Sequence, residues 1–582
     1  MPVRYRVEIA DLHAHQFRVT LSLPRPAAQQ RVSLPVWAPG SYMVRDFSRH
    51  LSALQAHQGQ QALDIEPIDK ACWQVRCTGR ASLVISCLVY AFDRSVRGAF
   101  LDATRGFFNG SSLFLRAHGH EHLAHRLELA SLPAQWSVAT AMASAGRRHY
   151  SAANYAELID HPFELGRFWR GDFVAGGAVH EVVVSGALPS FDGRRLLDDT
   201  RRICEQQQRF WQGATDVNAP FKRYVFLIQA ALDGHGGLEH RASSALLVAR
   251  RDLPRKPMDG LPDGYVAVLG LLSHEYFHAW SVKRLQPADL QPIDYGRENH
   301  TRLLWFFEGF TAYFDDLMLL RAGLIDLERY LRLVARNLNA VANTPGRQVQ
   351  SLAQASFDAW IKLYRSDENT PNATVNYYQK GALVALAFDL RLRREGGSLD
   401  QVMRLLWQRA ASAPGAVVDI AEADIAAAMD SVAGRSFADE LSAWVHGTLD
   451  PPVAELLAEL GVASRRERAG LAAALGLRLS EGPVTGAQVT AVLSDGAAER
   501  AGVSAGDELL AVDGWRIRRL DDALAWLEAG QVFDLLVVRD QRILSLRVIP
   551  QAAAVAASSV QLQVLPKPSR LDAARRRAWL DG

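Results

Sequence analysis

The hydrophobic pattern changes twice along the chain, and this change constrains the fold more than any other feature. Up to about residue 165, short alternating runs are separated by Pro- and Gly-bearing segments, which is typical of strands and turns. From about residue 197, apolar residues recur at helical spacing, with one strand-like run at 223–229. Short strands with glycine turns return at 465–550. We therefore expect a multidomain α+β protein that begins with a β-sandwich-like domain.

These changes predict four regions, since a chain of 582 residues is too long for one core. They are an N-terminal β-rich domain at 1–165, a largely helical domain at 166–455, a third domain at 465–550 and a tail at 551–582. The tail is predicted to be a short amphipathic helix or a frayed end. Strand-like runs in the first region lie at 4–9, 17–23, 31–36, 81–90 and 112–116.

Composition argues against several functional classes. A formal net charge of +2 gives no general attraction to nucleic acid or to an anionic membrane. Apolar runs such as 265–272 are far shorter than the roughly 20 residues that a membrane helix needs. The first residues lack the apolar segment of a secretory signal, so we expect a cytoplasmic protein, with a processed secreted or periplasmic form as the alternative. The cysteines are predicted to be buried free thiols: Cys72, Cys77, Cys87 and Cys204.

The strongest motif is a pair of histidines four residues apart, His274-Glu275-Tyr276-Phe277-His278. No Pro or Gly interrupts residues 271–285, so we expect a helix there. Four helical residues turn the chain by about 400°, which places both imidazoles on one face, where they can share one Zn²⁺. Glu275 lies about 100° around the helix, close enough to take a proton from a metal-bound water. A core helix with two satisfied histidines is the alternative.

A second feature agrees with a metal site. The apolar stretch at 303–314 has one carboxylate, Glu308, in its middle. An unpaired buried carboxylate is costly, so Glu308 needs a cation or hydrogen bonds. Zinc held by His274 and His278 would complete a His₂Glu set with an open water position, whereas an ion pair with an arginine or lysine is the alternative. Asp315 lies on roughly the same helix face as Glu308. It could hydrogen-bond to a metal ligand or contact only solvent, and both interpretations stay open.

A rival histidine cluster lies at 118–125 in the first region. Its sequence, HGHEHLAH, includes His118, His120, His122 and His125. Such a tract is typical of metal binding, but no ligand geometry follows from its spacing. We therefore expect a solvated loop between strands.

Five stretches carry a resemblance to a known family. HEYFH at 274–278 is followed by WFFEGFTAYF at 305–314 and by NYYQKG at 376–381. Upstream of them stand PVWAPGSYMVRDFS at 35–48 and GGLEH at 236–240. Together these stretches resemble the glycyl aminopeptidase family of gluzincin zinc metallopeptidases, and the domain order fits to the end of the chain.

The resemblance implies a thermolysin-like catalytic domain with one Zn²⁺ per chain. The ion would be bound by His274, His278 and Glu308. Glu275 would serve as general base and pass the proton of a water molecule to the leaving amine.

Other roles are implied by the resemblance alone. Tyr378 matches the family's Tyr-x-Lys-Gly pattern and would stabilise the tetrahedral oxyanion, with its neighbour Tyr377 as the alternative. Glu239 matches the carboxylate that binds the free α-ammonium group of a substrate. The paired glycines, Gly236 and Gly237, fit a backbone that passes close to substrate. Without the family, this segment reads as a turn with a charged residue.

The implied function is a zinc-dependent aminopeptidase acting on peptides with a free N-terminus. A preference for N-terminal glycine or other small residues follows from the resemblance. Two alternatives stay open: a zinc endopeptidase on the same core, and a peptide-binding scaffold with a vestigial metal site.

Residues 475–479 and 501–514 resemble a PDZ domain, because a glycine turn, a strand and an Asp-Gly turn follow one another. The stretch 520–530 is predicted to be the helix that borders the peptide groove. Such domains bind extended C-terminal peptides at a sheet edge. Arg478 stands at the second glycine position of the usual Gly-Leu-Gly-Phe loop. A peptide or protein ligand and a structural or substrate-channelling role are therefore both open.

Overall fold

The computed structural model describes residues 1–130, 132–213, 219–411, 417–468, 470–482, 484–528, 530–550 and 558–581. The chain divides into two compact units. The first unit comprises Met1–Asn299, Arg321–Leu324 and Met403–Ala421, and the second comprises His300–Leu320, Ile325–Val402 and Glu422–Gly582. Among the described residues, none of the helices combines the length and apolarity needed to span a bilayer.

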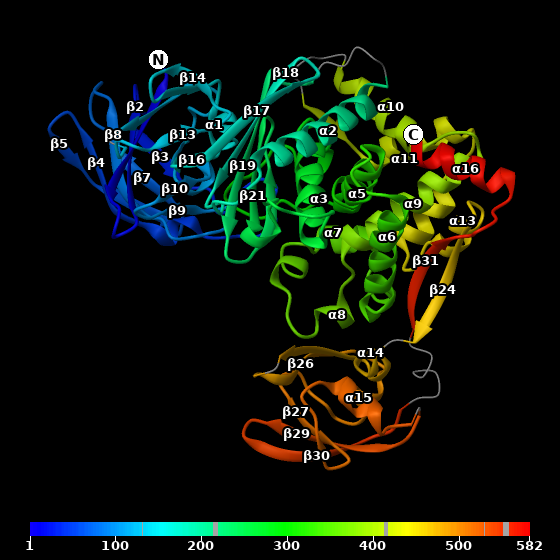
Figure 1. The fold of residues 1–582 in the computed structure, drawn as a ribbon. Coiled ribbons are helices and arrows are strands. Elements are labelled where there is room, and N and C mark those ends of the chain that lie inside the picture. Colours follow the sequence, from blue (N-terminus) through cyan, green and yellow to red (C-terminus); the bar gives the residue numbers. More distant parts are fainter. Residues whose placement is uncertain are drawn as a thin grey trace. The chain divides into compact units, whose positions relative to one another are not determined.

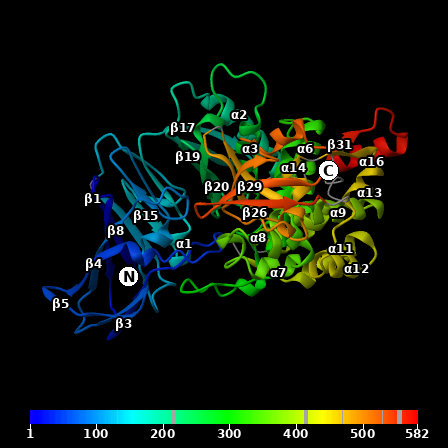
Figure 2. The ribbon, with the colours of Figure 1, turned by 90° about the horizontal axis from the view of Figure 1, so that it is seen from below.

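Three β-sheets build the N-terminal part of the first unit (Figures 1 and 2). The largest has the strand order β14 (Ala143–Gly146), β15 (His149–Ala152), β12 (His125–Ala130), β1 (Val3–Asp11), β2 (Gln16–Leu23), β8 (Leu83–Tyr90), β4 (Leu51–Gln58) and β5 (Gln61–Leu63). A second sheet has the strand order β13 (Ser137–Ala139), β16 (Phe163–Gly166), β10 (Arg105–Phe108) and β9 (Ala99–Leu101). A third has the order β11 (Arg116–Ala117), β3 (Gln29–Ser33), β7 (Cys72–Arg76) and β6 (Ile65–Asp69). Their inward faces share one hydrophobic core, so the predicted β-sandwich-like domain is confirmed.

Most predicted strands of this region are present. Those at 4–9, 17–23 and 81–90 correspond to β1, β2 and β8, whereas β3 ends earlier than the run at 31–36. The strand predicted at 112–116 is wrong, because a 3₁₀ turn at Gly110–Ser112 precedes a two-residue β11. The run is apolar since its middle residues are buried in the core, and burial alone does not make a strand. All four cysteines are free thiols, and Cys77 is only half-buried.

The first unit also has a five-stranded sheet, of which only the run at 223–229 was predicted. Its order is β17 (Trp169–Ala175), β18 (Ala178–Ser185), β19 (Arg223–Ala231), β21 (Ser243–Ala249) and β20 (His235–Glu239). β18, β19 and β21 are parallel and almost wholly buried, so they lack the alternation that identifies a strand. Helices α2 (Gly193–Gln212) and α3 (Asp263–Phe277) pack against this sheet (Figures 1 and 2).

Helix α9 (Tyr377–Arg394) is central to the helical part of the second unit. It packs against α4 (Leu304–Phe307), α6 (Leu327–Ala342), α7 (Leu352–Phe357), α11 (Glu422–Ala433) and α13 (Val453–Ala458). Most of its residues are buried on all sides, as expected for a core helix. The chain also forms helices α5 (Gly309–Arg321), α8 (Thr370–Ala373), α10 (Leu399–Ala411) and α12 (Ala438–Leu441). Helices therefore dominate this part of the chain, as the sequence predicts, whereas the domain limits at 166 and 455 stay a prediction.

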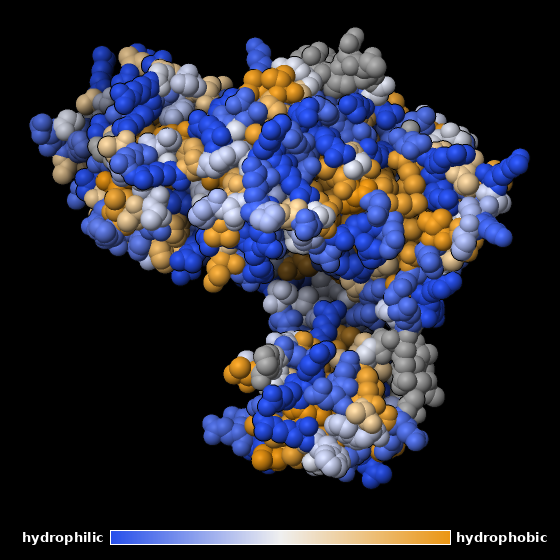
Figure 3. Space-filling view, viewed as in Figure 1, coloured by the Kyte–Doolittle hydropathy of each residue, from blue (hydrophilic) through white to orange (hydrophobic). Residues whose placement is uncertain are grey.

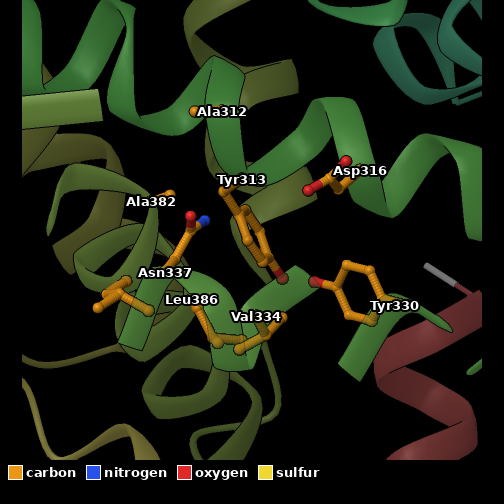
Figure 4. A pocket seen from close by; sticks show the side chains of 9 residues that line it. Ala312, Tyr313, Asp316, Tyr330, Val334, Asn337, Ala382 and Leu386 are labelled. Carbon is orange, nitrogen blue, oxygen red and sulfur yellow. The ribbon is translucent and has the colours of Figure 1, made fainter. Parts of the chain in front are cut away.

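A pocket lies between α5, α6 and α9 (Figure 4). The hydroxyls of Tyr313 and Tyr330 face each other there. Tyr313 also donates to Asp389 Oδ2 at 2.7 Å and accepts a hydrogen bond from Trp579 Nε1 at 3.0 Å. No predicted site residue lines this pocket. On the face shown in Figure 3, hydrophobic areas are separated by hydrophilic ones.

A small β-domain with its own hydrophobic core follows, as the PDZ resemblance predicts. Its strands are β25 (Leu477–Gly482), β26 (Gly486–Val492), β27 (Glu508–Val512), β28 (Trp515–Arg516), β29 (Phe533–Arg539) and β30 (Arg542–Val548), with helices α14 (Leu471–Leu475) and α15 (Ala497–Arg500). The helix predicted at 520–530 is a shorter 3₁₀ helix, Leu520–Ala525, and residue 529 lies outside the described residues.

The strands on either side of this domain pair with each other. β24 (Val462–Arg468) is antiparallel to β31 (Ser558–Val564). Asn339 of α6 exchanges hydrogen bonds of 2.9 and 2.6 Å with the backbone of Val560 in β31. The tail ends in helix α16 (Arg570–Asp581), whose Trp579 is fully buried. The short helix predicted for the tail at 551–582 is therefore present at 570–581, whereas strand β31 was not predicted, and residues 551–557 and 582 lie outside the described residues.

Candidate metal centre

The two motif histidines lie at the end of helix α3. His278 is the residue that caps this helix, so the helix stops well before the predicted limit at 285. The Nε2 atoms of His274 and His278 are 3.1 Å apart. His278 Nδ1 is 2.8 Å from the carbonyl oxygen of Ser281, a contact that holds the ring with Nε2 toward His274.

Tyr276 and the backbone of Glu275 anchor α3 within the first unit through hydrogen bonds. The hydroxyl of Tyr276 lies 2.8 Å from His180 Nε2 and accepts a hydrogen bond from Gln208 Nε2 at 2.7 Å. Tyr224 donates to the backbone oxygen of Glu275 at 3.2 Å. These buried polar contacts fix the rotation of the helix, and with it the face that carries the histidines.

Glu308 lies at the junction of α4 and α5 and is only 2% exposed. Its backbone N–H donates to Leu304 O, and its backbone oxygen accepts from Ala312 N, both at 2.8 Å. The ligand atoms of His274, His278 and Glu308 lie within 4.8 Å of one another, so the structure brings the three predicted ligands together.

Two glycines set the position of Tyr378 in the second unit. A Cβ added at Gly309 would lie 2.6 Å from the Cα of Gly381, so α5 and α9 cross with their backbones in contact. Tyr378 is in the first turn of α9, which Asn376 caps through bonds to the backbone N–H of Tyr378 and Gln379.

Tyr378 is distinguished from its neighbour by its surroundings. Its hydroxyl is 2.9 Å from that of Tyr364, and the residue is half-buried, whereas Tyr377 is fully buried. Burial and then the nearby Glu308 carboxylate raise the pKa of the Tyr378 phenol well above its ordinary value, which keeps the phenol protonated as a hydrogen-bond donor.

Lys380 of the same motif has a structural explanation. Its ammonium group donates to the backbone oxygens of Arg347 and Thr448 and pairs with Asp450 at 3.2 Å. Burial lowers the pKa of Lys380, and Asp450 opposes that shift. This side chain ties α9 to the segment where the helical region ends.

The segment predicted as a turn is strand β20, which contains Gly236, Gly237 and Glu239. Successive strand residues face opposite sides, and Leu238 enters the N-terminal hydrophobic core. Gly237 is packed against Glu275, because a Cβ at this position would collide with Oε1 of that carboxylate. The backbone therefore passes directly beside the predicted general base.

Gly40, in the N-terminal stretch at 35–48, approaches Glu239 in the same way. It has a φ of +94°, and a Cβ there would collide with both carboxylate oxygens of Glu239. Glu239 is only 5% exposed. The sequence did not predict this contact; its one local signal was the Pro-Gly-Ser turn within the stretch.

Asp160 is a second residue that the sequence did not reveal. Its carboxylate pairs with Lys283 Nζ at 2.8 Å, accepts from Arg241 N at 2.9 Å and lies 3.3 Å from His240 Nδ1. Burial alone would raise the pKa of Asp160, but Lys283 and His240 hold it well below its usual range. Asp160 thereby joins the segment after β20 to the segment after α3.

The rival histidine stretch forms no such group among the described residues. His118 Nε2 is 2.8 Å from Ser33 Oγ, and His125 Nδ1 is 2.7 Å from Leu123 O. The stretch joins β11 to β12, so the predicted loop is present at 118–124, but His125 is buried as the first residue of β12 and is not solvated. Burial lowers the pKa of both His118 and His125.

In the PDZ-like domain, Arg478 points to the helical part of the second unit. Its guanidinium donates to Asn343 O and Thr344 Oγ1 at 3.3 and 3.0 Å. Glu481 of β25 accepts from the backbone N–H of Leu520 at 2.8 Å, which connects the two elements that border a PDZ groove. These contacts favour a structural role, and peptide binding by this groove stays a prediction.

Comparison with known proteins agrees with this arrangement. The family model of the Peptidase M61 N-terminal domain matches residues 4–167, that of M61 glycyl aminopeptidase matches 267–384, and that of a PDZ domain matches 488–539. No match was found among curated proteins.

Among solved structures, an aminopeptidase N family protein from Idiomarina loihiensis is 34% identical, with a TM-score of 0.92. The match covers 99% of this chain and 100% of that chain. An M1 zinc metallopeptidase from Deinococcus radiodurans is 13% identical over 78% of this chain and 95% of that chain, with a TM-score of 0.46. On the whole-length match and the family models, the chain belongs to the M61 glycyl aminopeptidase family and is a peptidase with a C-terminal PDZ domain.

Proposed function

We propose that the protein is a zinc-dependent aminopeptidase that hydrolyses the first peptide bond of peptides with a free N-terminus. One observation carries this proposal: His274, His278 and Glu308 converge within 4.8 Å. This donor set, two imidazoles and one carboxylate, is the one that hydrolytic zinc sites use with a fourth position left for water.

The residues present fit zinc. Tetrahedral zinc holds its nitrogen ligands at about 2.0–2.1 Å, so two such nitrogens lie roughly 3.3 Å apart. The separation of 3.1 Å between the two Nε2 atoms agrees with that value. We propose one ion per chain. When bound, zinc lowers the pKa of a coordinated water to about 7 and polarises the scissile carbonyl.

Glu275 and Tyr378 supply the proton chemistry in this proposal. The Glu275 carboxylate accepts a proton from the attacking water and delivers it to the leaving amine. Packing against Gly237 holds that carboxylate in place, because the side chain and the strand backbone are in contact. The protonated Tyr378 phenol donates a hydrogen bond to the carbonyl oxygen as negative charge develops there.

Glu239 binds the α-ammonium group of the substrate through charge-assisted hydrogen bonds. It lies two residues from Gly237 on β20, so its carboxylate is on the same side of the strand as Glu275. Gly40 closes the space around the Glu239 carboxylate with main chain. This close backbone supports the proposed preference for glycine or other small N-terminal residues.

A panel of amino-acid p-nitroanilides, assayed with and without a chelator, tests the proposal. We expect hydrolysis of the glycine and alanine compounds that chelation abolishes and zinc restores. Chelator-resistant hydrolysis would contradict the metal's role.

Blocked peptides separate the proposal from its alternatives. We expect no cleavage of N-acetylated peptides and a large loss of activity on free-amine substrates in Glu239→Gln. Equal cleavage of acetylated peptides would instead identify an endopeptidase. A zinc-loaded protein that cleaves neither kind of peptide would favour the scaffold alternative.

A further inference from the structure

Arg97 extends from the loop between β8 and β9 to strand β20. Its Nη2 atom donates to the backbone oxygen of Gly237 at 3.2 Å, and Nη1 would be 3.7 Å from a Cβ on Gly236. The loop is held closed by its own hydrogen bonds, from Ser95 N to Asp93 Oδ1 at 2.8 Å and from Arg97 N to Ser95 Oγ at 3.2 Å. The guanidinium is therefore fixed beside Gly236 and Gly237, and Gly237 packs against the predicted general base.

The charge of Arg97 is not matched by an acidic side chain in the described part of the chain. Two other arginines of the N-terminal region are paired: Arg105 with Glu164 at 2.6 Å, and Arg116 with Glu121 at 2.7 Å. Arg97 is half-buried, and its guanidinium donates to a neutral backbone carbonyl, that of Gly237. Its Nε atom is buried and has no hydrogen-bond partner among the described residues. A guanidinium carries five donors, so this one has donors left for an anion.

The spacing along β20 suggests which anion. Gly237 and Glu239 are two residues apart in a strand, so their Cα atoms are separated by about 6–7 Å. The amine and the carboxylate of an extended dipeptide span a similar length, since each residue adds about 3.3–3.6 Å. A dipeptide that lies antiparallel to β20 with its amine at Glu239 has its carboxylate in the region of Gly237, where Arg97 is bound.

We propose that Arg97 binds the C-terminal carboxylate of short peptide substrates, so that the enzyme selects dipeptides by both of their charged ends. The inference rests on the proposed function, because it requires the amine at Glu239. Guanidinium and carboxylate form strong paired hydrogen bonds, and a half-buried site strengthens them further. Peptide amides and longer peptides lack a carboxylate at this distance.

The test compares Ala-Ala with its C-terminal amide. The full-length, zinc-loaded Glu275→Gln variant, which the proposed mechanism makes inactive, allows binding of both peptides to be measured by titration calorimetry. We expect Ala-Ala to bind roughly 10- to 100-fold more tightly than the amide. Adding Arg97→Gln, which keeps a donor for Gly237 but removes the charge, should abolish that preference, and Arg97→Lys should retain part of it.

Arg94→Ala is the matched control. Arg94 is in the same loop but lies over the rings of Phe92 and Phe100, so its loss should leave the acid-to-amide ratio unchanged. An unchanged ratio in Arg97→Gln, or an equal loss for both peptides, would show that Arg97 only supports β20 and would overturn this inference alone. Failure of either peptide to bind the parent variant would overturn the aminopeptidase proposal together with it.

Discussion

Two histidine-rich stretches of this chain differ in whether their imidazoles converge to form a metal-binding group. HEYFH at 274–278 contributes two imidazoles to a group with Glu308, whereas HGHEHLAH at 118–125, with more histidines, contributes none among the described residues. In the second stretch, His118 and His125 are close to a serine hydroxyl and a backbone carbonyl. The number of histidines therefore matters less than a scaffold that aims their nitrogens at one point.

The difference lies in what surrounds each stretch. Helix α3 is fixed by buried hydrogen bonds through Tyr276 and Glu275, and a buried carboxylate from a distant part of the sequence completes the group. The loop at 118–125 has an acidic residue, Glu121, but Arg116 pairs with it. A carboxylate already paired with arginine is a poor candidate for a metal ligand.

The largest expected effect concerns zinc content. His274→Ala and His278→Ala should each reduce bound zinc from about one per chain to almost none and abolish hydrolysis, because two protein ligands hold zinc weakly. His120→Ala and His122→Ala should change neither. Elemental analysis after dialysis checks this, and loss of zinc in the second pair would invalidate the comparison.

The acidic residue between the histidines sharpens the contrast. Glu275→Gln should keep its zinc but lower kcat by about 10²–10⁴-fold, since it loses the group that accepts the proton. Glu121→Gln, in the other stretch, should leave kcat close to that of the parent protein. Steady-state kinetics with parallel zinc assays measure both; undiminished kcat in Glu275→Gln would remove this residue from the mechanism.

Replacing one glycine associated with each stretch should have a smaller effect on kcat or stability. Gly237 contacts Glu275 of the first stretch, and Gly119 lies within the second. Gly237→Ala should lower kcat at least about tenfold, because its methyl group displaces the Glu275 carboxylate. Gly119→Ala has open space around it but a φ of +85°, so it should cost about 1–2 kcal/mol of stability and leave kcat unchanged. Kinetics and denaturant unfolding separate the two results, and the reverse assignment would contradict this account.

The smallest effect is the pH dependence of stability from a histidine outside the metal group. Burial lowers the pKa of His161 to about 4, against about 6.5 when unfolded. At pH values between these two, the unfolded chain binds the additional proton. The stabilisation from His161 is therefore complete above about pH 6.5 and declines as the pH falls toward 4, by at most about 3.4 kcal/mol.

Unfolding by denaturant between pH 7 and 4 measures this slope in the parent protein and in His161→Asn. We expect a shallower slope in the variant. Identical slopes would mean that His161 titrates alike in both states.

Local spacing was enough to predict the histidine pair, because helical periodicity alone places both rings on one face. Glu308 was predicted from the cost of burying an unpaired carboxylate. The end of α3 at Phe277 was not predicted, since no Pro or Gly marks it in the sequence. The buried strands β18 and β21 were missed because they lack an alternating pattern.

The contacts of Gly40, Arg97 and Asp160 were beyond prediction for a different reason. Each joins segments more than 80 positions apart, such as Asp160 with Arg241, or Gly40 with Glu239. Such contacts depend on tertiary packing, which no local pattern encodes. Gly381 illustrates the same limit: a family pattern includes it, but only the helix crossing with Gly309 explains it.

The position of Leu238 has a practical consequence for the design of truncated forms of this protein. Its side chain belongs to the hydrophobic core that residues 3–165 build, although its strand carries Glu239. A fragment starting after residue 165 would leave that leucine in water and the strand without its support. The smallest working enzyme should therefore include the N-terminal region, and shortening from this end removes activity before it removes the helices.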